Sequence, residues 1–365
     1  MHYQHHPEND PKYKGLSVNE GVESMPSINP YFTKKKKRKK LSAKEYVDGI
    51  LKGDVSILSQ AVTLVESSLP DDQKIAQEVI EKCLPYAGKS IRVGITGVPG
   101  AGKSTFIEAL GMRLIKNGEK LAVLAIDPSS ERTKGSILGD KTRMEELSAA
   151  KNAFIRPSPS AGSLGGVARK TRESIILCEA AGFTTVFVET VGVGQSETAV
   201  HSMVDFFLLI QLAGAGDELQ GIKRGIMEMA DGIAINKCDG TNVEKSKLAK
   251  RQFQNALHLF PLPESGWHPQ VVTCSSVENT GIVEVWQMVL DYIDFVKKNH
   301  YFEQKRTNQS KFWMYETINE KLKSDFYNNE RIQQLLAEAE EKVLNNEISS
   351  FVAASQLLAA YKSMI

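Results

Sequence analysis

Seven short apolar runs recur between residues 91 and 274, and helical patterns lie between most of them. Each run is almost continuously apolar, which is typical of a strand that is covered on both faces of a sheet. Strands that alternate with helices predict an α/β fold with a mostly parallel sheet, in which ligands bind beyond the carboxyl ends of the strands. The predicted strands are Ile91–Thr96, Leu121–Ile126, Ala153–Arg156, Thr185–Val188, Phe206–Leu212, Gly232–Ile235 and Val271–Cys274.

Helical patterns without strands lie on both sides of this region. Ser42-Ala43-Lys44-Glu45 has the sequence of a capping box and predicts the start of a helix. Gly53-Asp54 ends that helix and caps a second one, and a third begins near Pro70. We interpret these helices as a small N-terminal unit whose apolar stripes form its core.

After Asn299 the pattern predicts helices only, with three amphipathic stripes. Because these helices have no sheet of their own, their stripes must be buried on the main domain or on another chain, and we expect a helical dimerisation arm. The stripes are Phe312, Tyr315, Ile318 and Leu322; Ile332, Leu335, Leu336, Ala339 and Val343; and Phe351, Val352, Leu357 and Leu358.

These patterns divide the chain into four predicted parts. A polar and basic tail covers residues 1–40, the helical unit 41–88, the α/β domain 89–299 and the arm 300–365. The tail has no periodic apolar face and is expected to be disordered. Its run Lys34–Lys40 is interpreted as a solvated basic stretch, because no aromatic residues interleave it to stack on bases.

The composition is that of an ordinary soluble protein, with 41% hydrophobic and 24% charged residues. The net charge of +1 predicts no nucleic-acid partner. No apolar run approaches the length of a membrane span, so no membrane association is expected. Four cysteines without a CxxC pair, and no signal-peptide pattern before them, predict reduced thiols in a cytoplasm.

The segment Gly97-Val98-Pro99-Gly100-Ala101-Gly102-Lys103-Ser104-Thr105 matches the pattern Gly, four residues, Gly, Lys, Ser/Thr. It follows the first predicted strand and precedes a helical pattern, so a Gly-rich turn with an exposed lysine is the weaker interpretation. Loop N–H groups and the helix N-terminus would bind phosphate. Lys103 would contact the β/γ-phosphates and the Ser104 hydroxyl would bind Mg²⁺. We therefore predict binding of a nucleoside triphosphate.

Asn236-Lys237-Cys238-Asp239 follows the sixth predicted strand. The Asp239 carboxylate would accept hydrogen bonds from N1–H and the 2-amino group of guanine, whereas adenine offers no such pair of donors on that edge. The motif therefore favours GTP over ATP. Ser275, Ser276 and Val277 end the last run, where they either present backbone N–H groups to the base oxygen or form a helix-capping turn.

Three carboxylates follow two of the predicted strands. Glu189 comes directly after the fourth run, where an acidic side chain usually reaches magnesium through a water molecule. Asp127 and Asp140 lie in a polar loop after the second run, and each is either a helix N-cap or a metal-binding or catalytic group. We expect one of the three to orient the attacking water, and the pattern leaves the general base open.

Lys223 lies in the Gly-rich segment Leu212–Gly225, after the fifth run. Its glycines permit movement, so Lys223 and Arg224 would be able to swing toward phosphates. The alternative is a mobile surface loop.

Taken together, these motifs resemble the MeaB family of GTPase chaperones for cobalamin-dependent methylmalonyl-CoA mutase, which includes the MMAA and ArgK proteins. The resemblance runs from the N-terminal helical unit into the C-terminal arm and implies a P-loop GTPase of the dimerising SIMIBI class. The segments that carry it are Gly97–Thr105, Asp127–Ser130, Gly139–Met144, Glu189–Glu197, Gln211–Asp217 and Gly221–Gly225.

The resemblance implies a homodimer that couples GTP hydrolysis to the loading of adenosylcobalamin and protects the mutase from inactivation. Turnover is expected to be slow until the partner completes the site, and a cobalamin adenosyltransferase is a further implied partner. Lys223 corresponds to the family's mobile lysine. The implied phosphate and magnesium residues are Lys103, Ser104, Asp127, Asp140 and Glu189, and the implied guanine pocket contains Asn236, Lys237, Asp239, Ser275, Ser276 and Val277.

Three other functional classes remain open. A GTP-dependent metal-insertion chaperone would need a Cys/His cluster, but the cysteines are scattered and the doublet His5-His6 lies in the tail. An ATPase or kinase linked to amino-acid transport would not need Asp239 in its base pocket. A scaffold that binds nucleotide without turnover is a third alternative.

Overall fold

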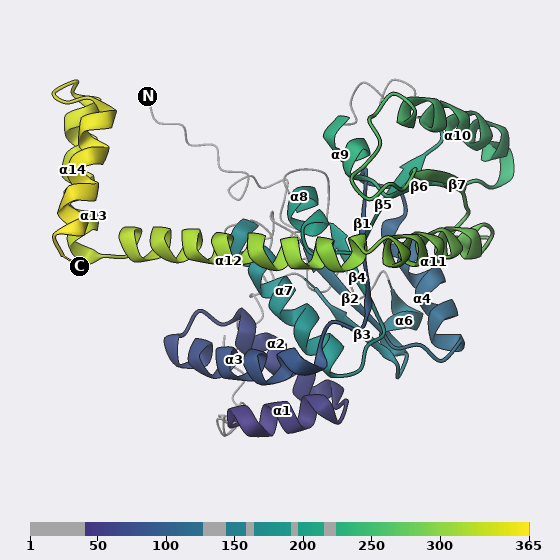
Figure 1. Ribbon diagram of the computed structural model, residues 1–365, viewed down its shortest axis with the longest axis horizontal. Coiled ribbons are helices and arrows are strands. Elements are labelled where there is room, and N and C mark those ends of the chain that lie inside the picture. The colour runs from purple at the N-terminus through teal and green to yellow at the C-terminus, as the bar shows by residue number, and fades with distance from the viewer. Residues whose placement is uncertain (1–40, 127–143, 158–163, 191–195, 215–223, 365) are drawn as a thin grey trace, which may run out of the picture. The chain divides into compact units, whose positions relative to one another are not determined.

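The computed structural model describes residues 41–126, 144–157, 164–190, 196–214 and 224–364 (Figure 1). Contacts divide the chain into Met1–Leu41 and Ser42–Ile365, and the fold below is that of the second unit. Several residues with a predicted role lie outside the described residues: Asp127, Asp140, Val191–Gln195 and Lys223.

All seven predicted strands are present in the described part of the chain, and each end differs from its predicted position by no more than two residues. They form one parallel sheet in the order β3-β2-β4-β1-β5-β6-β7. The fold class expected from the apolar runs is therefore confirmed. The strands are β1 (Ile91–Gly97), β2 (Leu121–Ile126), β3 (Ala153–Arg156), β4 (Thr185–Thr190), β5 (Phe206–Leu212), β6 (Gly232–Asn236) and β7 (Gln270–Thr273).

The central strand β1 lies between β4 and β5, although β4 and β5 come much later in the chain. Its register aligns Ile95 with Glu189 of β4 and Gly97 with Ile210 of β5. The carboxyl ends of these strands therefore meet at one edge of the sheet, which is where a doubly wound fold binds its ligands.

Helices cover both faces of this sheet. The side chains of α4 (Lys103–Lys116) and α11 (Ile282–Lys298) form a continuous core with one face of the strands. On the other face, a methyl group at Gly94 would lie 2.7 Å from Cγ1 of Val200, so only glycine allows α8 (Ser196–His201) to approach β1 this closely. The other helices of this region are α6 (Glu145–Ala149), α7 (Leu164–Ala180), α9 (Arg224–Met229) and α10 (Val243–Leu257), with the short 3-10 helices η3 (Leu84–Tyr86) and η4 (Gly240–Asn242).

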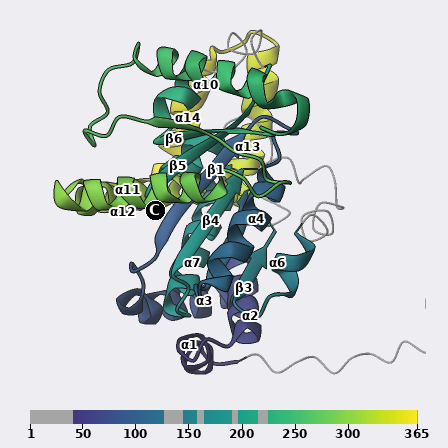
Figure 2. The same cartoon turned by 90° about the vertical axis from the view of Figure 1, so that its right-hand side faces the viewer.

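Three short helices precede the sheet: α1 (Ala43–Leu51), α2 (Val55–Glu66) and α3 (Pro70–Cys83). The capping box forms as predicted, since Ser42 N–H donates to Oε2 of Glu45 at 2.7 Å and Glu45 N–H donates to Oγ of Ser42 at 3.3 Å. All three helices pack against α7, as both views show (Figures 1 and 2). Arg156 at the end of β3 also forms an ion pair with Glu66 of α2.

The C-terminal region consists of α12 (Tyr301–Tyr327), α13 (Glu330–Leu344) and α14 (Ser350–Lys362). The first half of α12 is held by two buried side chains: Gln309 Nε2 donates to the carbonyl of Val204 at 2.8 Å, and the Trp313 indole N–H donates to that of Ser202 at 3.1 Å. The apolar stripe that the sequence predicts for α12 takes no part in these two contacts. Its four members are between 46% and 58% exposed: Phe312, Tyr315, Ile318 and Leu322.

Candidate functional site

The segment between β1 and α4 has the backbone geometry of a phosphate-binding loop. Gly97, at φ 152°, has no room for a side chain, because a Cβ there would lie 2.1 Å from the carbonyl oxygen of Ile210. Gly100 and Gly102 have φ values of 79° and 85°, which glycine adopts without strain. Gly102 is also the N-cap of α4, so the first N–H groups of that helix face the loop. The loop therefore fits an anion such as a phosphate group.

Lys103 is buried at the start of α4, and its ammonium group lies against this loop. Its Nζ donates to the carbonyl oxygen of Gly97 at 2.8 Å and to that of Val98 at 3.4 Å. Both acceptors are carbonyl oxygens, which carry no net charge. The geometry therefore suits an ion pair with a phosphate.

Ser104 and Glu189 meet at the carboxyl ends of β1 and β4. The Ser104 hydroxyl donates to Oε1 of Glu189 at 3.1 Å, and the Glu189 side chain is buried. A hydroxyl and a carboxylate are the oxygen ligands that Mg²⁺ prefers, so this pair fits the predicted cation. The other two predicted ligands, Asp127 and Asp140, lie outside the described residues.

Asn236 joins the phosphate loop to the segment after β7. Its Nδ2 donates to the carbonyl oxygen of Ala101 at 2.8 Å. Its Oδ1 accepts from the backbone N–H and the hydroxyl of Ser276, at 3.1 Å and 2.9 Å. A methyl group at Gly102 would lie 2.7 Å from Nδ2 of Asn236, so the third loop glycine is needed for this close contact. The structure therefore brings the predicted phosphate and base segments together.

The predicted guanine carboxylate is positioned from the same segment. The Ser275 hydroxyl donates to Oδ2 of Asp239 at 2.5 Å, and the Ser275 oxygen accepts from Glu278 N–H at 3.1 Å. Lys237, next to it in the motif, adopts a left-handed backbone conformation at φ 58°. A carboxylate held in this way can accept the two donors of a guanine edge.

The three N–H groups expected to face the base oxygen are not equivalent. Ser275 N–H donates to the carbonyl of Thr280 at 2.9 Å, and Ser276 N–H is used by Asn236. The N–H of Val277 has no acceptor among the described residues, and its side chain is 78% exposed. Val277 is therefore the member of the triplet that can donate to a ligand.

A buried pair of hydroxyls beside the phosphate loop was not singled out from the sequence. The Thr190 hydroxyl donates to Oγ1 of Thr96 at 2.9 Å, and both side chains are fully buried. The contact joins the strand before the phosphate loop to the strand that carries Glu189. The sequence shows only that Thr96 and Thr190 lie at the ends of two apolar runs. That the two hydroxyls meet depends on the strand order, which the sequence does not give.

A model of the family described as "Methylmalonyl Co-A mutase-associated GTPase MeaB" matches residues 58–331 of the chain. The chain belongs to the MeaB family. This MeaB-family protein is therefore a GTPase, and the nucleotide that it binds is a guanine nucleotide. The expected resemblance is confirmed, and with it the choice of GTP.

Known proteins of two kinds are similar to this MeaB-family chain. It is 46% identical over 313 residues to the GTPase ArgK of Escherichia coli (strain K12), covering 86% of this chain and 95% of that protein. It is also 43% identical over 325 residues to the "Methylmalonic aciduria type A homolog, mitochondrial" of Mus musculus. That match covers 86% of this chain and 78% of the mouse protein.

A solved structure shares the fold. The crystal structure titled "LAO/AO transport system kinase" matches with a TM-score of 0.70 and 39% identity, and the match covers 88% of this chain and 97% of that one. Among the described residues, no helix is long and apolar enough to cross a membrane.

Proposed function

We propose that this GTPase is a chaperone of a cobalamin-dependent methylmalonyl-CoA mutase, gating the loading of adenosylcobalamin and protecting the mutase from inactivation. The observation that carries the proposal is the match of residues 58–331 to a family described as associated with this mutase. It is supported by similarity to a methylmalonic aciduria type A homolog.

The reaction is in-line attack of water on the γ-phosphate of GTP. The Lys103 ammonium and the N–H groups at the start of α4 stabilise the charge that develops on the phosphate oxygens. Ser104 and Glu189, with the predicted Asp127 and Asp140, would hold Mg²⁺, which supplies further charge neutralisation when bound. One of the three carboxylates orients the water.

The active form is a homodimer in which the C-terminal helices contact a second copy. Support comes from a groove of about 500 Å³ lined mainly by apolar side chains of α13, α14 and the end of α12. Leu344, which lines the groove, is 81% exposed, and Phe351 at the start of α14 is 84% exposed. Lys223 is proposed to enter the nucleotide site when the mutase docks.

The test is phosphate release from GTP, measured with the purified chain alone and with cobalamin-free mutase. The mutase should raise the rate, and adenosylcobalamin added to the mixture should load onto the mutase only when GTP is present. Lys103→Ala should reduce the rate by about 100-fold or more, since it removes a charge that stabilises the transition state. Lys116→Ala, at the exposed end of the same helix, is the control and should behave as the wild type.

An unchanged rate and no cobalamin transfer in the presence of the mutase would refute the chaperone role while leaving the GTPase assignment intact. A kinase linked to amino-acid transport, one of the alternatives that the sequence left open, is the second candidate, because the similar crystal structure is titled a transport system kinase. It predicts phosphoryl transfer from ATP to an acceptor. Comparison of ATP and GTP turnover separates the two functions.

A further inference from the structure

Gln211 is a buried polar side chain at the carboxyl end of β5, beside the phosphate loop. It is 1% exposed, and its amide oxygen has no hydrogen-bond partner among the described residues. The residue before it, Ile210, carries the carbonyl that leaves no room for a side chain at Gly97, the first glycine of the loop. Burying an acceptor without a donor costs stability, and such groups are rare in folded proteins.

The side chain of Gln211 lies on the same face of the sheet as the buried hydroxyl pair of Thr96 and Thr190. Side chains alternate between the two faces along a strand. Ile210 and Ile95 belong to the core shared with α4 and α11, so their neighbours Gln211 and Thr96 point to the opposite face. Thr190 is on that face too, because its hydroxyl donates to Thr96 at 2.9 Å. Three buried polar side chains therefore share the face that α8 covers.

Gln211 and Thr96 are within reach of each other. The pairing of β1 with β5 places Thr96 opposite Leu209, two residues before Gln211. With strands about 4.8 Å apart and a rise of about 3.3 Å per residue, the Cα atoms of such diagonal neighbours are about 8 Å apart. A glutamine and a threonine side chain together span this distance. A change of rotamer at Gln211 can therefore bring its amide oxygen to the Thr96 hydroxyl.

The Thr96 hydroxyl is the donor that Gln211 lacks. Thr96 accepts from Thr190, and its own proton has no acceptor in the described part of the chain. A buried donor and a buried acceptor, both unmatched, thus lie on neighbouring strands. Pairing them would extend the hydrogen-bond chain across β4, β1 and β5.

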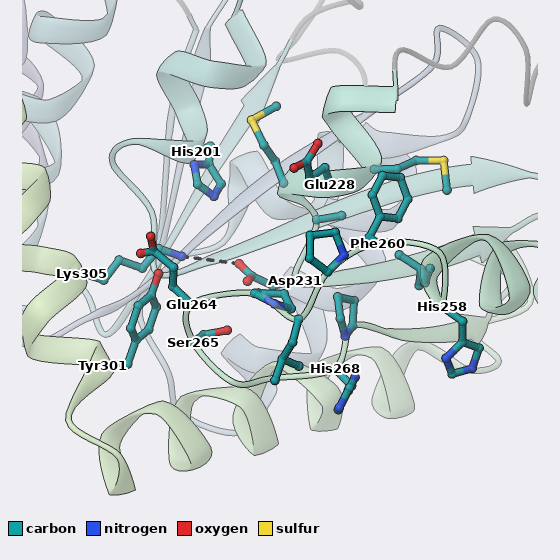
Figure 3. A pocket seen from close by; sticks show the side chains of 18 residues that line it. His201, Glu228, Asp231, His258, Phe260, Glu264, Ser265, His268, Tyr301 and Lys305 are labelled. Carbon is teal, nitrogen blue, oxygen red and sulfur yellow. Dashed lines mark ion pairs between the residues drawn. The ribbon is translucent and has the colours of Figure 1, made fainter.

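Buried charges at the amino edge of the same sheet are paired instead. Lys305 forms an ion pair at 3.5 Å with Asp231, which precedes β6, and Figure 3 marks this pair with a dashed line. Arg306 forms an ion pair at 2.7 Å with Asp205, which precedes β5. The unmatched donor and acceptor are therefore a feature of the edge that carries the phosphate loop.

The bond between Thr190 and Thr96 adjoins groups that contact the ligand at both of its ends. Thr96 directly precedes the phosphate loop. Thr190 directly follows Glu189, which is proposed to hold Mg²⁺ together with Ser104. Binding of a nucleotide with its cation therefore acts on β1 and β4 at the positions of this bond.

We propose that Gln211 is a positioning residue for GTP hydrolysis. When GTP and Mg²⁺ bind, its amide oxygen accepts from the Thr96 hydroxyl and completes a hydrogen-bond chain with Thr190. This chain fixes the end of β4, and with it Glu189, relative to the phosphate loop. The inference rests on the proposed magnesium role of Glu189 and is independent of the chaperone role.

Gln211→Met tests the role, because it keeps the length of the side chain and removes the acceptor. Phosphate release from GTP by the full chain should show kcat lowered about tenfold and KM changed less than about threefold, since the energy of the bond is used for orientation. The midpoint of urea unfolding without nucleotide should not decrease, because the variant loses only an acceptor that has no donor. A side chain with a purely structural hydrogen bond would lower that midpoint.

Thr96→Val removes the donor and should also lower kcat at least about tenfold. Adding Gln211→Met to Thr96→Val should slow hydrolysis by less than about twofold further, because the bond is already lost. The matched control is Ser246→Ala on α10, which removes another buried hydroxyl without a partner among the residues that the structure describes. This control should keep the wild-type kcat.

The proposal is overturned if Gln211→Met hydrolyses GTP as the wild type does, if the effects of Gln211→Met and Thr96→Val multiply, or if Ser246→Ala slows hydrolysis as much. Glu189→Gln is measured alongside. A wild-type rate in Glu189→Gln would refute the magnesium role and this proposal with it, whereas a loss there with a wild-type rate in Gln211→Met would refute the role of Gln211 alone. All rates are measured without the mutase, so a failure of the chaperone role leaves them unchanged.

Discussion

Asn236 shows how one amide side chain can organise a binding site. Its Nδ2 donates to the phosphate loop at Ala101, and its Oδ1 accepts from Ser276 beyond β7. An aspartate at this position would lack the donor, and an aliphatic residue would leave buried backbone groups without partners. The positions of the phosphate loop and of the base segment are thus linked through a single residue.

The base preference depends on Asp239. Asp239→Asn should lower the affinity for GTP by about 100-fold, because an amide cannot accept both the N1–H and the 2-amino donors. The same variant should gain affinity for xanthosine triphosphate, whose 2-oxo group accepts from the new amide. Calorimetric titration with both nucleotides measures the change.

Asp71→Asn, at an exposed position of α3, is the control and should keep the wild-type preference. Equal GTP affinity in the wild type and Asp239→Asn would contradict a base-reading role for this carboxylate.

The partly buried His201 should make stability depend on pH. Burial and the charge of Lys305 lower its pKa from 6.5 to about 4, although Asp231 opposes this effect. Between these two values the unfolded chain binds a proton that the folded chain does not, so stability falls as the pH decreases from 6.5 to 4. The loss is about 3 kcal/mol for this group.

Urea unfolding at a series of pH values measures this dependence. His201→Phe keeps an aromatic ring beside Phe207. This variant should no longer show the loss of stability between pH 6.5 and 4. The control His258→Phe, at an exposed position, should lose stability over this pH range as the wild type does. If the free energy of unfolding depends on pH in the same way in the wild type and in His201→Phe, His201 is not the source of the acid sensitivity.

At the scale of elements, α12 is attached to the sheet through a buried ion pair. The Arg306 guanidinium donates to both carboxylate oxygens of Asp205, at 2.8 Å and 2.7 Å, and to the carbonyl of Ser90 at 2.7 Å. Asp205 also accepts from the Arg92 N–H at 2.8 Å. These contacts connect α12 with the segments that precede β1 and β5.

Arg306→Gln should destabilise the protein by about 3 kcal/mol, because it leaves the buried Asp205 charge without its cation. Lys311→Gln, which removes a charge from an exposed position on the same helix, should change the stability by less than about 0.5 kcal/mol. The midpoint of urea unfolding reports both. Equal midpoints would show that the ion pair does not hold α12 in place.

For the whole molecule, the main question is what covers the apolar surface of the C-terminal helices. The α12 stripe and the groove of α13 and α14 are exposed within one chain. Exposed apolar surfaces of this kind are typical of protein interfaces. A second copy of the chain is the proposed partner.

Ile318→Glu should therefore weaken dimerisation by about 100-fold, which corresponds to about 3 kcal/mol. Sedimentation velocity over a range of concentrations measures the dissociation constant. Asn308→Glu introduces the same charge at an exposed site in the first half of α12 and should leave the dimer intact. A wild-type chain that sediments as a monomer at all concentrations would contradict the proposed assembly.

The sequence alone determined the strands, the phosphate loop and the base motif. Each of these depends on neighbours in the chain: an apolar run identifies a buried strand, and glycines before a Lys-Ser pair identify the loop. The capping box at Ser42 was predictable for the same reason, because both of its partners lie within one turn of helix.

Only the tertiary structure decided which distant groups meet. The contacts of Asn236 with Ala101 and Ser276, and of Thr190 with Thr96, depend on the strand order. The α12 stripe showed which side of the helix is apolar but not what covers it, and the helix is held instead by Gln309 and Trp313. Periodicity records the character of a surface, whereas its partner depends on how the whole chain packs.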